Sequence, residues 1–263
     1  MSERSGTIGQ MAVAALYDIH GNLPALEAVL AEDDVQRAGT IVVGGDVAPG
    51  PLVAEVLDRL AALGDRVRYV RGNADREVID AYERWAAGVL SLADDASPPE
   101  RMAAWVAARL NDAHRRLLAG FEPTVSLTID GLGGVLFCHG SPRSDLDIIT
   151  EATSHEKLAV LIRDCDERLI VGGHTHMQLD RRAGGRRFIN PGSVGAPYED
   201  GPGAYWALLG PDVEFRRTVY DHEAAAEIMR ASGDPYAEDQ IQASLLAPIG
   251  RAEAVRQLDP DPA

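Results

Sequence analysis

The chain has 263 residues, of which 46% are hydrophobic and 25% are charged. This composition is ordinary for a soluble globular protein, and the length allows a sizeable core without help from disulfide bonds. No apolar run approaches the roughly 20 residues of a membrane span, and residues 1–10 lack the pattern of a secretory signal, so we expect neither a membrane nor a secreted protein. The presence of only two cysteines, Cys138 and Cys165, favours a reducing, cytoplasmic location.

The charge balance is strongly acidic, with 41 Asp and Glu against 25 Lys and Arg and a net charge of −16. A molecule of this charge repels polyphosphate backbones, so we expect no non-specific binding of nucleic acid. An anionic substrate can still bind where local cations reverse the field. The sequence leaves the oligomeric state open, a homo-oligomer included.

Strand and helix signals alternate through the first third of the chain. Asn22 and Pro24 are residue types typical of the first positions of a helix. Three strand–loop–helix units in succession favour a parallel sheet covered by helices. The strands and helices expected here are, in order, Val13–Tyr17, Leu23–Val35, 41–43, Val53–Leu63, Val67–Val70 and a helix that ends at Trp85.

The middle of the chain changes character, because residues 86–120 are rich in alanine and arginine with helical spacing. We interpret this segment as a helical insertion, serving either as a lid or as a subunit contact. Beyond it we expect mainly strands, a turn at residues 190–193 that supports the preceding histidine loop, and a polar tail that is loose from Arg251. The strands and helices expected here are Thr124–Ile129, Gly134–Cys138, Ser154–Cys165, Arg168–Val171, Gln178–Arg182, Arg186–Ile189, Ala204–Leu209, Val213–Val219 and Asp221–Leu246, the last broken at Gly233-Asp234-Pro235.

Polar residues with metal-binding side chains follow successive expected strands. Asp18 and His20 are one residue apart at a strand end, where a period of two places both side chains on one side, so that both can chelate one ion. His174 and His176 repeat this spacing directly after two glycines. In open α/β sheets, sites form at this carboxyl edge of the strands. Three further candidates stand at strand ends beside glycines, namely Asp46, Asn73 and His139.

These candidate ligands comprise two carboxylates, one amide oxygen and four imidazoles. Mixed nitrogen and oxygen donors suit manganese, iron, cobalt, nickel or zinc, and the number of histidines disfavours magnesium and calcium. The set exceeds what one ion needs, so we expect two divalent transition-metal ions, with manganese foremost. Two such ions would outweigh the two carboxylates and create an electropositive point suited to a phosphate.

The order of these motifs resembles that of the calcineurin-like metallophosphoesterase superfamily, whose pattern is D-x-H, G-D, G-N-H-D/E, H and G-H-x-H. The match runs from about residue 11 to 220 and looks like the compact bacterial and archaeal phosphodiesterase branch related to diadenosine tetraphosphatases. The resemblance implies an α/β fold, a four-layer α/β/β/α sandwich, in a single domain over residues 1–263 with a C-terminal helical tail at 221–263. The matching segments are Asp18-Ile19-His20, Gly45-Asp46, Gly72-Asn73-Ala74-Asp75, His139 and Gly173-His174-Thr175-His176.

The resemblance also implies a role for each motif residue. A phosphate ester would be hydrolysed by a hydroxide that bridges the two ions. One ion would be held by Asp18, His20, Asp46 and His176, and the other by Asp46, Asn73, His139 and His174. The catalytic residues would be Asp18, Asp46, Asn73 and His139, with Asp75 orienting its loop. The candidates for contact with substrate phosphate are Asn22, Arg71 and Arg143.

The third motif departs from the family pattern, because Ala74 stands where a histidine usually protonates the leaving group or holds substrate. General-acid help of this kind is worth about 10²–10⁴-fold, so poor leaving groups such as a serine alkoxide should suffer most. We therefore expect hydrolysis of phosphodiesters or nucleotide phosphoanhydrides, with a small phosphorylated molecule or nucleotide as substrate. The alternatives are a phosphomonoesterase or protein phosphatase, and a metal-stabilised, non-catalytic interaction scaffold such as the retromer subunit that resembles the same branch.

Overall fold

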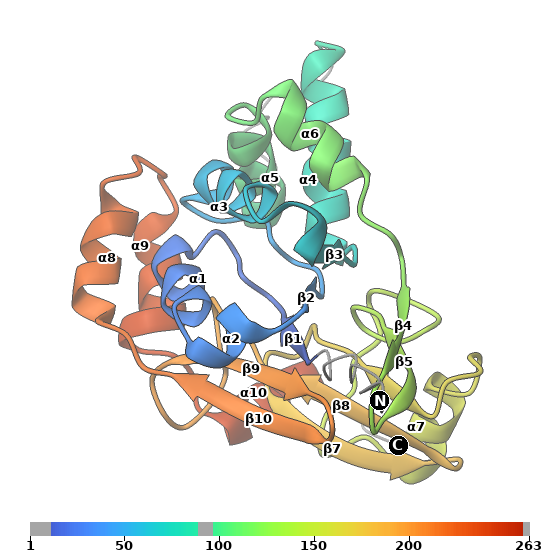
Figure 1. Ribbon diagram of the computed structural model, residues 1–263. Helices are drawn as coiled ribbons and strands as arrows, with labels where there is room; N and C mark the ends of the chain where they lie inside the picture. Colours follow the sequence, from blue (N-terminus) through green and yellow to red (C-terminus); the bar gives the residue numbers. More distant parts are fainter. Residues whose placement is uncertain (1–11, 89–96, 260–263) are drawn as a thin grey trace, which may run out of the picture.

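The computed structural model describes residues 12–88 and 97–259. Two five-stranded mixed sheets pack face to face, with helices on their outer faces (Figure 1). The predicted α/β/β/α sandwich with a helical insertion is confirmed. In the described part of the chain, none of the helices has the length and apolar character needed to cross a membrane.

The first sheet has the strand order β10-β9-β1-β2-β3. β1 pairs in parallel with β2, with Val13 opposite Thr40, and β2 pairs in parallel with β3, so three consecutive carboxyl ends lie at one edge. β9 joins the other side of β1 in antiparallel orientation. The bounds are β1 Val13–Leu16, β2 Thr40–Val43, β3 Val67–Tyr69, β9 Ala204–Leu209 and β10 Val213–Thr218.

The second sheet has the order β4-β5-β6-β8-β7. β5 and β6 are parallel neighbours, and β7 and β8 form the predicted antiparallel hairpin. The carboxyl ends of β5 and β6 therefore also share an edge. The bounds are β4 Val125–Ile129, β5 Gly133–Phe137, β6 Leu169–Val171, β7 Gln178–Ala183 and β8 Arg186–Pro191.

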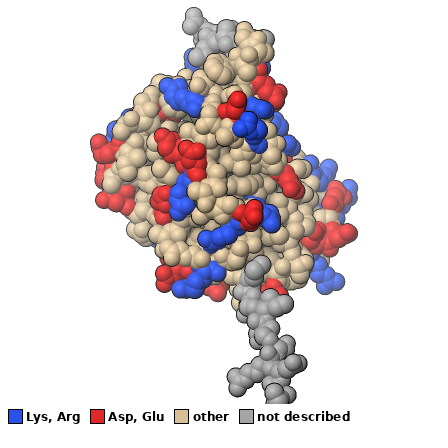
Figure 2. All heavy atoms as spheres, turned by 45° about the horizontal axis from the view of Figure 1, so that its top comes forward, with Lys and Arg blue, Asp and Glu red and all other residues tan. Residues whose placement is uncertain are grey.

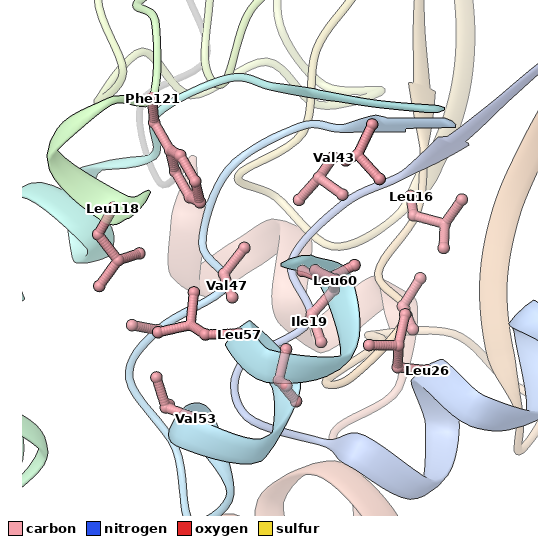
Figure 3. Close-up of a cluster of buried hydrophobic side chains, with 14 of the residues drawn as sticks. Leu16, Ile19, Leu26, Val43, Val47, Val53, Leu57, Leu60, Leu118 and Phe121 are labelled. Atoms are coloured by element: carbon pink, nitrogen blue, oxygen red, sulfur yellow. The ribbon is translucent and has the colours of Figure 1, made fainter. Parts of the chain in front are cut away.

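The helices cover the outer faces because each presents one apolar side. α3 buries Val53, Val56, Leu57 and Leu60, the spacing of a single helical face. Figure 3 shows this face against Leu16 and Val43 of the first sheet and neighbouring residues. The helix bounds are α1 Leu23–Leu30, α2 Asp33–Arg37, α3 Val53–Ala61, η1 Gly64–Arg66, α4 Asn73–Ala86, α5 Pro98–Ala107, α6 Asp112–Ala119, α7 His155–Leu161, α8 His222–Arg230, α9 Ala237–Ile241, η2 Gln242–Leu246 and α10 Arg251–Leu258.

A separate core lies between the two sheets. Along β1, Val13 and Ala15 join this inner core, whereas Ala14 and Leu16 join the core beneath the outer helices. A strand that is buried on both faces reads as a continuous apolar run, and the sequence of β1 has that character. β1 therefore contributes side chains to both layers, as its neighbours β2 and β9 also do.

Two sequence predictions about helices are wrong. The predicted helix Leu23–Val35 is broken at Glu32, which has an extended backbone. A second helix begins after it, with Asp33 and Asp34 in its first turn, because carboxylates there interact favourably with the helix dipole. The tail from Arg251 was expected to be loose, but it forms α10. Arg251, at the start of this helix, ties it to the rest of the protein. Its guanidinium donates hydrogen bonds to Glu151, to Glu199 and to the carbonyl of Gln178.

The insertion consists of α5 and α6, which pack against α4 and α3. Its predicted start, residue 86, is the last residue of α4. The stretch 89–96 of the predicted insertion and the last tail residues, 260–263, lie outside the described residues.

Tyr17 joins the two sheets directly beneath the carboxyl edge. Its buried hydroxyl donates to the carbonyl of Val171 in β6 at 3.0 Å. Its ring lies so close to Gly44 that a Cβ atom there would overlap it. We therefore expect Gly44→Ala to lower the free energy of unfolding by about 1–3 kcal/mol, as overpacking of a core does.

Urea denaturation monitored by circular dichroism measures this loss. Gly134→Ala in β5 is the matched control, because its Cβ would meet only the Glu167 side chain at an ordinary 3.5 Å. Equal stability of the two variants would contradict the role of Tyr17 packing.

Candidate metal centre

The structure brings all seven candidate metal ligands to the carboxyl edge that the two sheets share. Asp18 and His20 follow β1, Asp46 follows β2, and Asn73 opens α4 after β3. From the second sheet, His139 follows β5, and the two remaining histidines, His174 and His176, follow β6. Loops from five strands thus meet at one point.

Six of these residues form two groups whose ligand atoms lie within 4.8 Å of one another. The first group is Asp18, His20 and His176, and the second is Asp46, His139 and His174. Asp46 also reaches toward the first group, since its Oδ2 lies 3.3 Å from His139 Nε2 and 3.9 Å from His20 Nε2. Asp46 therefore stands between the groups.

The backbone route to this geometry differs from the predicted one. β1 ends at Leu16, so Asp18 and His20 are not strand residues and the period-two argument for their common direction is wrong. Both instead adopt left-handed backbone, with φ of 54° and 47°. The equal spacing of His174 and His176 also does not make them partners, because they belong to different groups. Asp46, His174 and His176 are the other left-handed non-glycine residues of the described chain.

Unpaired polar atoms at the centre test whether metal ions fit. Asp18 Oδ1, Asn73 Oδ1 and His139 Nε2 are buried and have no hydrogen-bond partner among the described residues. Buried polar atoms are normally paired, so three such atoms at one centre call for a ligand. Each is an atom type that binds divalent metals. Asn73 lines one pocket together with Asp46 and His20, so its side chain can add a seventh donor to the two groups. The residues fit two metal ions.

Hydrogen bonds to main-chain carbonyls fix the histidine rings. His139 Nδ1 lies 2.9 Å from the Gly44 carbonyl, and His176 Nδ1 lies 2.6 Å from the Ala196 carbonyl. A nitrogen that faces a carbonyl must carry a proton, so Nε2 is the atom of each ring that can bind a metal ion once the ring is neutral. This arrangement is the usual support of metal-binding histidines.

Asp75 holds the loops that carry Asp46 and Asn73. Its carboxylate accepts hydrogen bonds from the backbone N–H groups of Asp46, Ala48 and Gly72 at 2.9–3.0 Å. A side chain on Gly72 would overlap the Asp46 carboxylate, so only glycine permits this approach. Burial, followed by the charge of Asp46, raises the pKa of Asp75 to about 7.

The histidines of the metal-free site differ in protonation state. Burial and the neighbouring histidines lower the pKa of His174 to about 4 and that of His176 to about 3, so both rings are neutral at pH 7. Burial opposes charge on His139, but the Asp46 carboxylate outweighs it and raises that pKa to about 10. A cation bound beside Asp46 would take the place of the His139 proton.

The three candidate phosphate contacts differ in their surroundings. Asn22 does not fit this role: it is fully buried, and its side chain bonds to the Ala25 N–H, the Gly195 carbonyl and the Tyr220 hydroxyl. Its interpretation as a helix N-cap is confirmed. Arg71 and Arg143 line one cavity of about 280 Å³ together with His139.

Sequence reasoning missed several residues that support or border the site. Gln240, from α9, donates to the His20 carbonyl at 2.7 Å, and the ring of Tyr198 stacks on His176 with a centroid separation of 5.1 Å. Arg76 lines the cavity of Arg71. No local motif marks these residues, because long-range folding alone brings them to the site. The turn at 190–193 does support the histidine loop, as predicted, through Asn190, which donates to the Gly173 carbonyl.

Comparisons with known proteins agree with this geometry. The sequence pattern of the calcineurin-like phosphoesterase superfamily domain matches residues 11–210. A solved metallophosphoesterase from Sphaerobacter thermophilus is 30% identical, with a TM-score of 0.70 over 90% of this chain and 99% of that one. The hypothetical protein PH1004 from Pyrococcus horikoshii shares the fold at 20% identity, with a TM-score of 0.71 over 89% of this chain and 97% of that one. No curated protein sequence gives a significant match. The chain belongs to the calcineurin-like phosphoesterase superfamily and is a metal-dependent hydrolase of phosphate esters.

Proposed function

We propose that this protein hydrolyses phosphodiesters or nucleotide phosphoanhydrides with two divalent transition-metal ions, manganese foremost. The observation that carries the proposal is the pair of ligand groups with Asp46 between them and unpaired ligand atoms at their centre. Ions bound there would supply Lewis acidity and an activated water. The donor set of carboxylate, amide and imidazole suits manganese and its neighbours in the transition series.

Each residue of the site has a distinct task in this proposal. Asp18, His20 and His176 would hold one ion, Asn73, His139 and His174 would hold the other, and Asp46 would serve both. The catalytic group is Asp18, Asp46, Asn73 and His139, because these side chains define the centre over which the reacting phosphorus must lie. Asp75 positions the loops and does not touch substrate.

Arginines beside the centre provide local positive charge for substrate phosphate. Arg71 faces the cavity that His139 also lines, and no ion pair engages its guanidinium within residues 12–88 and 97–259. Arg143 lies at the exposed side of the same cavity, where it pairs with Asp164. Acidic and basic side chains are interspersed over the face in Figure 2, so the net charge of −16 forms no single repulsive patch there.

The leaving-group argument rests on Ala74. Its N–H donates to Asp46 Oδ1 at 2.9 Å, which places its methyl group at the edge of the metal centre. That methyl lines a cavity of about 300 Å³ with the apolar side chains of Val78, Met102 and Ala103, and with Glu77 at its exposed side. A methyl group cannot donate a proton, so substrates with stable leaving groups are favoured.

We further propose that the chain works as one domain, 1–263, with its core at 11–220. The described insertion helix α5 and the C-terminal segment both contribute side chains to cavities beside the metal centre. The insertion at 86–120 would then form part of the substrate site and would not be only a subunit contact.

Removal of Asp46 tests the dinuclear centre. We expect Asp46→Asn to bind fewer than two equivalents of Mn²⁺ and its kcat to fall by about 100-fold or more. Mutation of residues that only hydrogen-bond to metal ligands already lowers metal affinity or activity by about 10–100-fold. Elemental analysis measures the metal, and the rise in Tm on adding Mn²⁺ measures binding without reference to turnover.

Asp130→Asn is the matched control, because Asp130 is exposed in the β4–β5 turn at the opposite end of the strands. Full metal content together with full activity in Asp46→Asn would remove the mechanism.

A substrate panel tests the proposed class. For the Mn²⁺-loaded protein we expect kcat/KM on an aryl diester or a dinucleoside polyphosphate to exceed that on a phosphoserine peptide by about 10²-fold or more, because no general acid follows Asn73. An aryl monoester completes the panel, and His139→Ala should abolish every activity that belongs to this site.

Faster turnover of the phosphoserine peptide would point to a protein phosphatase instead. Two bound metal ions with no turnover of any ester would favour the scaffold.

A further inference from the structure

The metal centre borders two cavities of opposite character. The arginine cavity, of about 280 Å³, is lined by Arg71, Arg143, His139 and the ion pair of Arg76 with Asp145. A second cavity of about 510 Å³, here called the apolar cavity, is lined by the metal-site residues His20 and His176. The two share no lining residue, so they adjoin different ligands of the centre.

The wall of the apolar cavity comes from distant parts of the chain. Met102 belongs to α5 in the insertion, Ala243 to η2 near the C-terminus, and Tyr198 to the loop after β8. These segments are green, red and orange in Figure 1. The pocket beside Ala74 shares His20, Pro49 and Met102 with this cavity and therefore continues it. A long apolar surface thus runs from the metal centre outward.

Hydrogen bonds tie this wall to the metal site. Gln240 donates to the His20 carbonyl at 2.7 Å, and the Ser244 hydroxyl donates to the Gln240 carbonyl at 2.6 Å. The backbone here makes a π-turn, in which Ala247 N–H bonds to the Gln242 carbonyl at 2.9 Å. Single π-turns occur often at functional sites, and this one places Ala243 and Ser244 in the cavity wall.

The chemistry of the wall is that of a site for a flat, largely apolar group. The Tyr198 ring lies nearly parallel to the His176 ring, with an interplanar angle of 15°. Asp239, Gln240 and Ser244 add a few polar groups to an otherwise apolar lining. A mostly hydrophobic pocket with a few polar groups and a volume within about 300–1,000 Å³ is typical of small-molecule sites.

We propose that the apolar cavity binds the nucleobase of a nucleotide phosphoanhydride. Its phosphate chain then lies over the metal centre and extends to Arg71. This inference rests on the proposed function, and it selects nucleotides over simple diesters as the substrate class. A phosphate chain alone would leave the apolar cavity empty, whereas a base with its phosphates matches both cavities at once.

Two probes that differ only by the nucleoside test the subsite. Isothermal titration of the Mn²⁺-loaded protein would compare adenosine α,β-methylene diphosphate with methylenediphosphonate, neither of which has a hydrolysable P–O–P bond. Base stacking should make the nucleoside probe bind about tenfold more tightly or better. Arg71→Gln should weaken both probes by similar factors.

Ala243→Trp fills the cavity from an exposed helical position. We expect it to reduce the affinity for the nucleoside probe about tenfold and that for methylenediphosphonate less than twofold. Ala243→Gln should give the same loss without adding an aromatic ring. Ala224→Trp, also exposed but on α8 outside the cavity, should change neither affinity.

Equal affinity of the wild type for the two probes would overturn the subsite, as would an unchanged preference in both Ala243 variants. Failure of the nucleobase subsite can be distinguished from failure of the proposed hydrolytic function. Nucleoside preference without hydrolysis of any ester would retain the subsite and remove the proposed activity. Hydrolysis of an aryl diester with equal probe affinities would do the reverse.

Discussion

The close approach of two sheets at one edge is the constraint on which the site depends. Each ligand group takes side chains from both sheets: Asp18 with His176, and Asp46 with His139 and His174. Neither sheet alone could assemble either group. Tyr17 maintains the approach, since its hydroxyl reaches β6 and its ring packs against glycines where any side chain would collide. The inter-sheet core therefore sets the distance between the two halves of the candidate metal centre.

The backbone and the unpaired atoms of the site destabilise the folded state locally, and the rest of the fold must offset this free energy. Left-handed backbone at a non-glycine residue costs on the order of 1–3 kcal/mol, and five candidate ligands adopt it. Unpaired buried atoms at the centre, such as Asp18 Oδ1, add to this cost. The hydrogen bonds of Asp75 to three backbone N–H groups and the hydroxyl of Ser193 on the Asp18 carbonyl hold these loops in place. Metal binding would satisfy the unpaired atoms, so the metal and the fold stabilise each other.

The sequence predicted that the candidate ligands lie together better than it predicted the backbone that places them. Their proximity was readable because each candidate stands in a short polar loop directly after an apolar strand, and strand order then brings the loops together. The direction of Asp18 and His20 was not readable, since a left-handed aspartate or histidine leaves no local pattern. The roles of Gln240 and Tyr198 were hidden for a different reason: their partners lie far away in sequence. Asn22 was misassigned because a polar residue beside a ligand motif can equally be a buried cap.

The proposed catalytic residues and the proposed nucleobase site lie on different parts of the chain. The ligands come from strand-end loops inside the segment that matches the superfamily, residues 11–210. Part of the apolar wall comes from η2, which lies beyond that segment, and part from α5 in the insertion. A change in η2 or α5 could therefore reshape the apolar cavity without moving a candidate metal ligand. The hydrogen bond from Gln240 to the His20 carbonyl limits this independence, because a shift of α9 would reach the metal centre through that contact.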